Sequence, residues 1–273
     1  MKILISADME GLSGVVDWGH VDSSHTEYPR FCRIMTAEVN AAICGAFNGG
    51  ADQILVADAH GGKRNIIVEE LDLRAQLQCG SPSPLAMMEG VQKTVDAVIL
   101  IGYHAMAGTE AAVLAHTISG RITNLRLNGQ NTGEIGLNCA LAGHFHAPVI
   151  MVSADQAGCH EAGTIQPSIH TVETKQAVGM YAARCLPPGI VQDKIKDTAC
   201  KAVSQLLNSQ VPATHQIEGP VLIEMEFNFP ILAEKAAALP CARRQNGRSI
   251  EIISDDMLTA YVNLRSAIKL ASS

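Results

Sequence analysis

A strand–helix–strand pattern at the start of the chain is the feature that most constrains its fold. The apolar run Lys2–Ile5 is typical of a β-strand, the helical spacing of apolar residues predicts a helix over Phe31–Asn48, and Gln53–Ala57 reads as a second buried strand. Such a unit places two parallel strands in one sheet, joined by a right-handed crossover. Two more apolar runs predict further strands, Ala97–Gly102 and Pro148–Ser153. We therefore expect an α/β fold, an open and mostly parallel sheet flanked by helices.

The pattern changes past about residue 165. Two runs, Val221–Phe227 and Ser249–Ile253, alternate between apolar and polar residues, as strands of an antiparallel sheet wetted on one face do. A last amphipathic helix follows, with Asp255 as its expected N-cap. We expect two domains, residues 1–165 as a metal-binding catalytic α/β domain and residues 166–273 as a smaller α+β domain. Earlier in the chain, Asn128-Gly129 predicts a hairpin turn.

Composition excludes several classes of function. The formal net charge of −7 argues against nucleic acid or an anionic membrane as the main partner. No apolar run approaches the roughly 20 residues that span a bilayer, and two acids within the first ten residues argue against a signal peptide. The eight cysteines form no C-x-x-C pair, which is typical of core residues in a reducing compartment. The sequence predicts a cytoplasmic protein.

Ligand-type side chains follow the predicted strands of the first domain. Asp8 and Glu10 come directly after the first strand, where alternate residues share a face, His60 follows the second strand, and His104 follows the strand Ala97–Gly102. Glu134 opens a helix. Ligands bind outside the carboxyl ends of the strands of an open α/β sheet, so four of these five residues belong to one edge by topology.

Carboxylates together with imidazoles are ligands that suit zinc, manganese and similar divalent ions. Three carboxylates and two imidazoles are too many for a single open catalytic zinc site, and they fit two metal ions bridged by one carboxylate. Each histidine by itself would also be explained as a loop residue with local hydrogen bonds. From the pattern alone, both interpretations stay open.

Four segments of the first 155 residues, in the same order, resemble the motifs of the dinuclear-zinc D-aminopeptidases, the S-x-D-x-E-G metallopeptidases. They are Ser6-Ala-Asp-Met-Glu-Gly-Leu-Ser-Gly14, Asp58-Ala-His60, Gly102-Tyr-His-Ala105 and Gly133-Glu-Ile-Gly-Leu-Asn138. An isolated S-x-D-x-E-G would be a weak signal, whereas the four motifs together are a specific one. Beyond residue 165 the resemblance covers only length and general pattern.

The resemblance implies a role for each candidate residue. Asp8 would bridge two zinc ions, with Glu10 and His60 on one ion and His104 and Glu134 on the other. His116 would be a catalytic histidine that donates a proton or a hydrogen bond as the tetrahedral intermediate forms and collapses. For His116, a strand-start histidine with a backbone partner is the alternative.

The function implied by this resemblance is an aminopeptidase that hydrolyses short peptides or amides with a free N-terminal D-residue such as D-Ala. The implied assembly is a ring-shaped homo-oligomer, for which a decamer is one candidate. Two other interpretations are another dimetal amide or ester hydrolase on the same scaffold, and a non-catalytic metal- or peptide-binding accessory protein of peptide uptake.

Weaker candidates surround the predicted ligands. Asp58 would either orient the His60 imidazole or cap a loop amide, and Asn138, one helical turn after Glu134, would either touch substrate or face solvent. Arg64 and Asn65 would either contact a substrate carboxylate or lie at the surface, and the surface position is the expected one.

Overall fold

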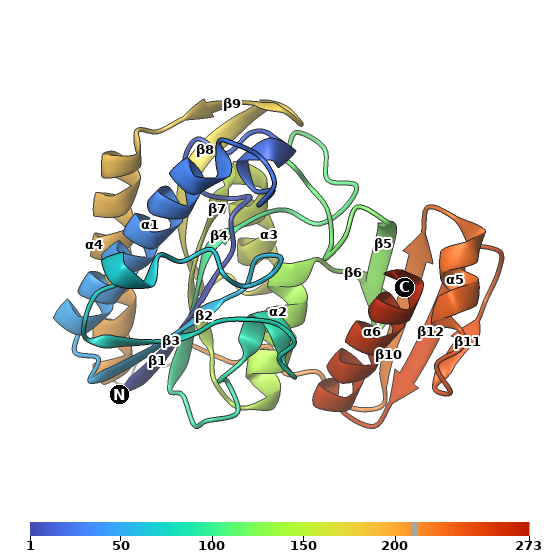
Figure 1. Cartoon of the computed structure of the whole chain (residues 1–273). Coiled ribbons are helices and arrows are strands. Elements are labelled where there is room, and N and C mark those ends of the chain that lie inside the picture. Colours follow the sequence, from blue (N-terminus) through green and yellow to red (C-terminus); the bar gives the residue numbers. More distant parts are fainter. Residues whose placement is uncertain (209–211, 273) are drawn as a thin grey trace.

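A seven-stranded sheet forms the larger part of the molecule (Figure 1). The computed structural model describes residues 1–208 and 212–272. The strand order is β3-β2-β1-β4-β7-β8-β9, and all neighbours are parallel except the terminal β8–β9 pair. The strands are β1 Lys2–Ala7, β2 Gln53–Asp58, β3 Ala75–Gln78, β4 Ala97–Tyr103, β7 Val149–Asp155, β8 His170–Gly179 and β9 Ala182–Cys185. The predicted α/β fold with a mostly parallel sheet is confirmed.

Helices cover both faces of this sheet (Figure 1). On one face lie α1 Tyr28–Asn48 and α4 Pro188–Leu207, which pack side by side, and on the other lie α2 Glu134–His144 and α3 Gln156–Ile165. Successive residues of a strand point to opposite faces. Ile3 and Ile5 accordingly pack in the core under α1 and α4, whereas Leu4 packs in the core under α2. The central strands are buried on both sides, which is why they read as continuous apolar runs.

A smaller antiparallel sheet forms the second part, in the order β11-β12-β10-β5-β6. Its strands are β5 Ile122–Leu127, β6 Gln130–Asn131, β10 Val221–Phe227, β11 Ala242–Arg244 and β12 Ser249–Ser254. Two helices pack on it, α5 Pro230–Ala236 and α6 Met257–Ser272, and α6 also contacts α2 (Figure 1). In β10, buried residues alternate with half-buried ones. Asn128 and Gly129 both have positive φ, as the predicted hairpin turn requires.

The two sheets divide the chain differently from the two predicted domains. Residues 170–207, assigned to the smaller domain, form β8, β9 and α4 of the large layer, and β5 and β6 reach the small sheet from the first half of the chain. Because β8 is only partly buried, its sequence lacks the continuous apolar run of β4 or β7. The domain boundary at residue 165 therefore stays a prediction. After that residue the chain still forms part of the large layer, and it returns to the small sheet only at β10.

Three short segments are single turns of 3₁₀ helix: η1 Trp18–His20, η2 Val68–Glu70 and η3 Ala86–Met88. The last helix begins one residue later than its expected cap implies, because the side chain of Asp256, and not that of Asp255, accepts a hydrogen bond from the backbone N–H of Thr259. Among the described residues, no helix is long and apolar enough to cross a membrane.

Candidate metal centre

Five predicted ligands meet at the carboxyl edge of the large sheet. Strands β2, β1 and β4 are adjacent and parallel, and the last residue of β1, Ala7, lies opposite both Asp58 of β2 and Ile101 of β4. The loops after these strands therefore start side by side and carry Asp8, Glu10, His60 and His104. Glu134 joins them as the first residue of α2. The structure brings together every residue that the sequence pattern selected.

Backbone hydrogen bonds and close packing against the end of β4 hold the loop after β1 in place. The backbone N–H of Asp8 donates to the carbonyl of Ile101, and that of Gly11 donates to the carbonyl of Gly102, both at 2.8 Å. A Cβ on residue 11 would lie 1.7 Å from the carbonyl oxygen of Tyr103, so this position requires glycine. The motif S-x-D-x-E-G thus ends in the glycine that lets the loop backbone lie directly against the end of β4.

A buried lysine holds the same loop from the other side. The ammonium group of Lys175, on β8, donates to the backbone carbonyls of Glu10, Leu12 and Val15 at 2.5–2.9 Å. Its side chain is fully buried, and burial lowers the pKa of Lys175 to about 8. One cation therefore binds three carbonyls of the loop, of which that of Leu12 also accepts from the backbone N–H of Val15. The sequence does not predict this role of Lys175, because nothing in the local pattern of β8 indicates a partner some 160 residues away.

Asp8 faces two histidines through its two oxygens. Its Oδ1 lies 3.1 Å from Nδ1 of His60, and its Oδ2 lies 3.5 Å from Nε2 of His104. Glu10 Oε2 lies 3.1 Å from Nδ1 of His60, and Glu134 Oε1 lies 3.2 Å from Nε2 of His104. The groups thus form two clusters, each with one imidazole and one glutamate, with Asp8 between them. This is the arrangement that a bridging carboxylate needs.

The backbone sets the tautomer of each histidine. Nε2 of His60 donates to the carbonyl of Val21 at 2.9 Å, Nδ1 of His104 donates to that of Ala105 at 3.1 Å, and Nδ1 of His116 donates to that of Leu114 at 2.9 Å. A carbonyl can only accept, so the proton of each neutral ring is committed there. The other ring nitrogen, with its lone pair, is turned toward the carboxylates, as in metal-binding histidines.

His116 lies over the two clusters. Its ring stacks on that of His104 at 4.0 Å between centroids and meets the edge of Trp18 at 5.1 Å. Its Nε2 is 3.9 Å from Glu10 Oε1 and 3.9 Å from Glu134 Oε1, farther than the closest contacts of the other two histidines. Ligand atoms of His104, His116 and Glu134 also lie within 4.8 Å of one another. A ligand role and a catalytic role both fit this position.

Without a cation, protons balance the buried carboxylates. Burial alone would raise the pKa of Asp8, but its hydrogen bonds with His104 and His60 outweigh burial and lower that pKa. Burial would lower the pKa of His104, but the negative charge of Glu134 and hydrogen bonds with Asp8 and Glu134 raise it well above its ordinary value. A divalent ion can replace such protons, because it favours the same charged carboxylates.

The residues present fit a metal site by a second criterion. In the neutral ring, whose proton is on Nδ1, the fully buried Nε2 of His104 carries a lone pair to which no described residue donates a hydrogen bond. A buried polar atom of this kind is costly unless a ligand satisfies it. Together with three carboxylates and a second imidazole, it forms a donor set that suits zinc. Asp8, Glu10, His60 and Glu134 of this set line a cavity of about 740 Å³, whereas His104 is buried.

The surrounding residues hold the loops and do not contact the ligand rings directly. Asp58 accepts hydrogen bonds from the backbone N–H groups of Asn65 and Ile66, so it caps a loop, and the carbonyl of Val21 orients His60 in its place. Asn65 is buried and donates to the carbonyl of His60, so its expected surface position is wrong. Asn138 is buried too and donates to the hydroxyl of Tyr103, which corrects both expectations for it.

Comparisons with known proteins agree along the full chain. A family model described as D-aminopeptidase matches residues 1–266. The chain is 34% identical over 272 residues to the D-aminopeptidase of Bacillus subtilis (strain 168), with 99% of this chain and 98% of that protein covered. It is also similar to a solved structure, the Zn-dependent D-aminopeptidase DppA from Bacillus subtilis, described as a self-compartmentalizing protease. The TM-score is 0.93 at 32% identity, and 100% of this chain and 98% of that chain are covered.

Proposed function

The chain belongs to the D-aminopeptidase family, and from that premise we propose that its cavity is the active site of a two-metal aminopeptidase. Membership confirms the resemblance indicated by the four sequence motifs. The proposed substrates are short peptides or amides with a free N-terminal D-residue such as D-Ala. The observation that carries the proposal is the set of three histidines that each commit one ring proton to a backbone carbonyl and face three carboxylates with the other nitrogen.

We assign the ligands by the two clusters. Asp8 bridges, Glu10 and His60 hold one ion, and His104 and Glu134 hold the other. Zinc is supported by the donor set and by the Zn-dependent relative. When bound, two such ions supply an activated water at neutral pH and polarise a carbonyl oxygen.

The protein's own groups orient the substrate and move protons. His116, the only one of the three histidines outside this ligand set, holds a proton on Nε2 when charged, while its Nδ1–H stays on the carbonyl of Leu114. From there it donates to the oxygen on which negative charge develops, or to the departing amine. The acids in the cavity lining are Asp8, Glu10 and Glu134, so the substrate's ammonium group binds beside them, which places the first peptide bond at the clusters.

The function is tested by metal content together with a panel of alanine dipeptides. The zinc-loaded protein is expected to hydrolyse D-Ala-D-Ala with a kcat/KM higher than that for L-Ala-L-Ala by roughly 10²-fold or more. Chelation should abolish hydrolysis, and added zinc should restore it. Metal binding without hydrolysis of any dipeptide would contradict the proposal and favour an accessory protein of peptide uptake. Equal rates on both dipeptides would favour a different dimetal hydrolase.

We also propose that the protein forms a homo-oligomer, with a ring as its shape and a decamer as one candidate. Large apolar side chains are exposed at the β8–β9 turn, where Val178, Met180 and Tyr181 are 67%, 43% and 54% exposed. The carbonyl of Met180 accepts a hydrogen bond from the backbone N–H of Leu114, close to His116 in the chain. The name of the similar solved structure also refers to self-compartmentalization.

Light scattering is expected to give a mass that is a multiple of 28.9 kDa. A double change of Met180 and Tyr181 to lysine should shift the protein toward smaller species, because two charges would be buried at a subunit contact. A monomeric wild-type protein at micromolar concentration would rule out the assembly. The cytoplasm stays our prediction for location, and it rests on the eight cysteines, which are all free.

A further inference from the structure

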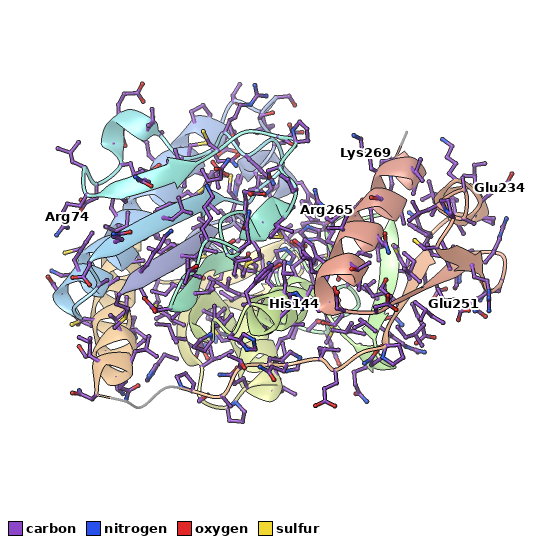
Figure 2. All side chains as sticks on the ribbon, turned by 90° about the horizontal axis from the view of Figure 1, so that it is seen from below. Arg74, His144, Glu234, Glu251, Arg265 and Lys269 are labelled. Carbon is purple, nitrogen blue, oxygen red and sulfur yellow. The ribbon has the colours of Figure 1, made fainter. Side chains whose placement is uncertain are left out.

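The cavity that holds the candidate metal ligands has a positively charged wall. Besides the carboxylates and His60, its lining includes Lys63, from the loop after β2, and Arg265 and Lys269 of α6. Arg265 and Lys269 are four residues apart and share one side of the helix. Figure 2 shows Arg265 on the side of α6 that faces the large sheet, between the two parts of the molecule. The metal site thus lies in the same cavity as three cationic side chains.

Lys63 is buried without a carboxylate partner. Only 4% of the residue is exposed, its ammonium group donates to the hydroxyl of Ser83, and no ion pair joins it to another described residue. Two acids act on Lys63 through their charge, and both are hydrogen-bonded elsewhere, Asp58 to backbone N–H groups of its own loop and Glu89 to the N–H of Leu85. Burial and the positive charge of Arg265 lower the pKa of Lys63 to about 8. Both cations line the same cavity, where a bound anion would stabilise their positive charges.

The backbone around Lys63 is also held in an unfavourable conformation. Lys63 has a φ of 56°, in the left-handed region that non-glycine residues rarely adopt. The strained position is fixed by hydrogen bonds from its N–H to the carbonyl of His60 and from the N–H of Gly80 to its carbonyl. Two glycines directly precede it in the chain, yet the strained position carries a lysine. The same short loop thus holds a candidate metal ligand, His60, and a buried cation three residues later.

We infer that Lys63 and Arg265 bind the C-terminal carboxylate of the peptide substrate, which makes the enzyme selective for very short peptides with a free C-terminus. This inference rests on the proposed function. A dipeptide carries an ammonium group at one end and a carboxylate at the other, and the cavity offers acids and cations in the same way. Each further residue lengthens an extended peptide by about 3.5 Å. A longer peptide would therefore carry its carboxylate past Lys63 and Arg265.

The test compares a dipeptide with its neutral amide on the zinc-loaded enzyme. We expect kcat/KM for D-Ala-D-Ala to exceed that for D-Ala-D-alaninamide by roughly 10- to 100-fold, which is the size of hydrogen bonds to a charged group. Most of the difference should appear in KM. Hydrolysis of both peptides at equal kcat/KM would overturn the inference and leave the proposed function standing. Hydrolysis of neither would overturn the proposed function, and the inference with it.

Neutral variants identify the residues responsible. In Lys63→Gln, whose amide can still donate to Ser83, and separately in Arg265→Gln, the ratio of kcat/KM between acid and amide should fall toward one. Lys201→Gln, which removes the same charge from an exposed position on α4, should keep the wild-type ratio. If Lys63→Gln does not fold, the half-buried Arg265 carries the test. A wild-type ratio in both cavity variants would show that the carboxylate binds elsewhere.

Discussion

Replacing Asp8 by alanine is expected to reduce the bound metal from about two ions per chain to one or fewer. Each oxygen of Asp8 faces a different histidine, so a single substitution removes a ligand from both clusters. Hydrolysis of D-Ala-D-Ala should fall by roughly 10⁴-fold or more, as when groups that act as a unit lose a central member. Elemental analysis of purified protein, together with kcat on that dipeptide, measures both effects.

The control for this variant is Asp193→Ala. Asp193 is exposed on α4, on a helix that contributes no residue to the cavity, so its removal should change neither metal content nor activity. Circular dichroism of both variants checks that the fold is kept. If Asp8→Ala retains two metal ions, Asp8 is not a ligand and the two-cluster assignment is wrong.

His116→Ala is expected to separate catalysis from metal binding. If His116 donates a proton or a hydrogen bond and is not a ligand, the variant should keep its metal and lose roughly 10²- to 10⁴-fold in kcat. His104→Ala should lose metal along with activity, because the variant lacks the buried Nε2, to which no described residue donates a hydrogen bond and which we assign as a metal ligand. The paired measurement is metal stoichiometry and kcat for both variants.

The comparison is informative because the rings of His104 and His116 are stacked, with 4.0 Å between their centroids, and yet are assigned different roles. The exposed His160 of α3 serves as the control, and His160→Ala should behave as wild type. Metal loss in His116→Ala would make this histidine a ligand, which its proximity to His104 and Glu134 allows. Retention of both metal and near-normal kcat would reduce it to a histidine with a backbone partner.

The edge of the sheet at which the site lies could be predicted from the sequence, because it follows from the order of strands and helices in the chain. A strand–helix–strand unit makes β1 and β2 parallel, and parallel strands end at the same edge of a sheet. The order of these elements therefore places Asp8, Glu10 and His60 at one edge. The hairpin at Asn128-Gly129 was predictable for a similarly local reason, since its two residues tolerate positive φ.

The extent of each sheet was not predictable in the same way. The half-buried β8 does not show the apolar run of a central strand, so its place in the large sheet follows from pairing with β7. Strand β5, from the first half of the chain, pairs with β10 almost a hundred residues later. Such pairings depend on which surfaces remain uncovered after the first units pack, and local patterns do not contain that information.

The sequence by itself determined which residue types reach the carboxyl edge of the sheet, because alternation and crossover direction follow from local geometry. Only the tertiary structure decided what those residues can do. Backbone carbonyls from distant loops select the histidine tautomers, Lys175 ties the Asp8 loop to β8, and α6 brings Arg265 to the cavity that holds Lys63. Charge and hydrogen bonding act over a few ångströms, between groups that lie far apart in the chain, and folding alone sets those distances.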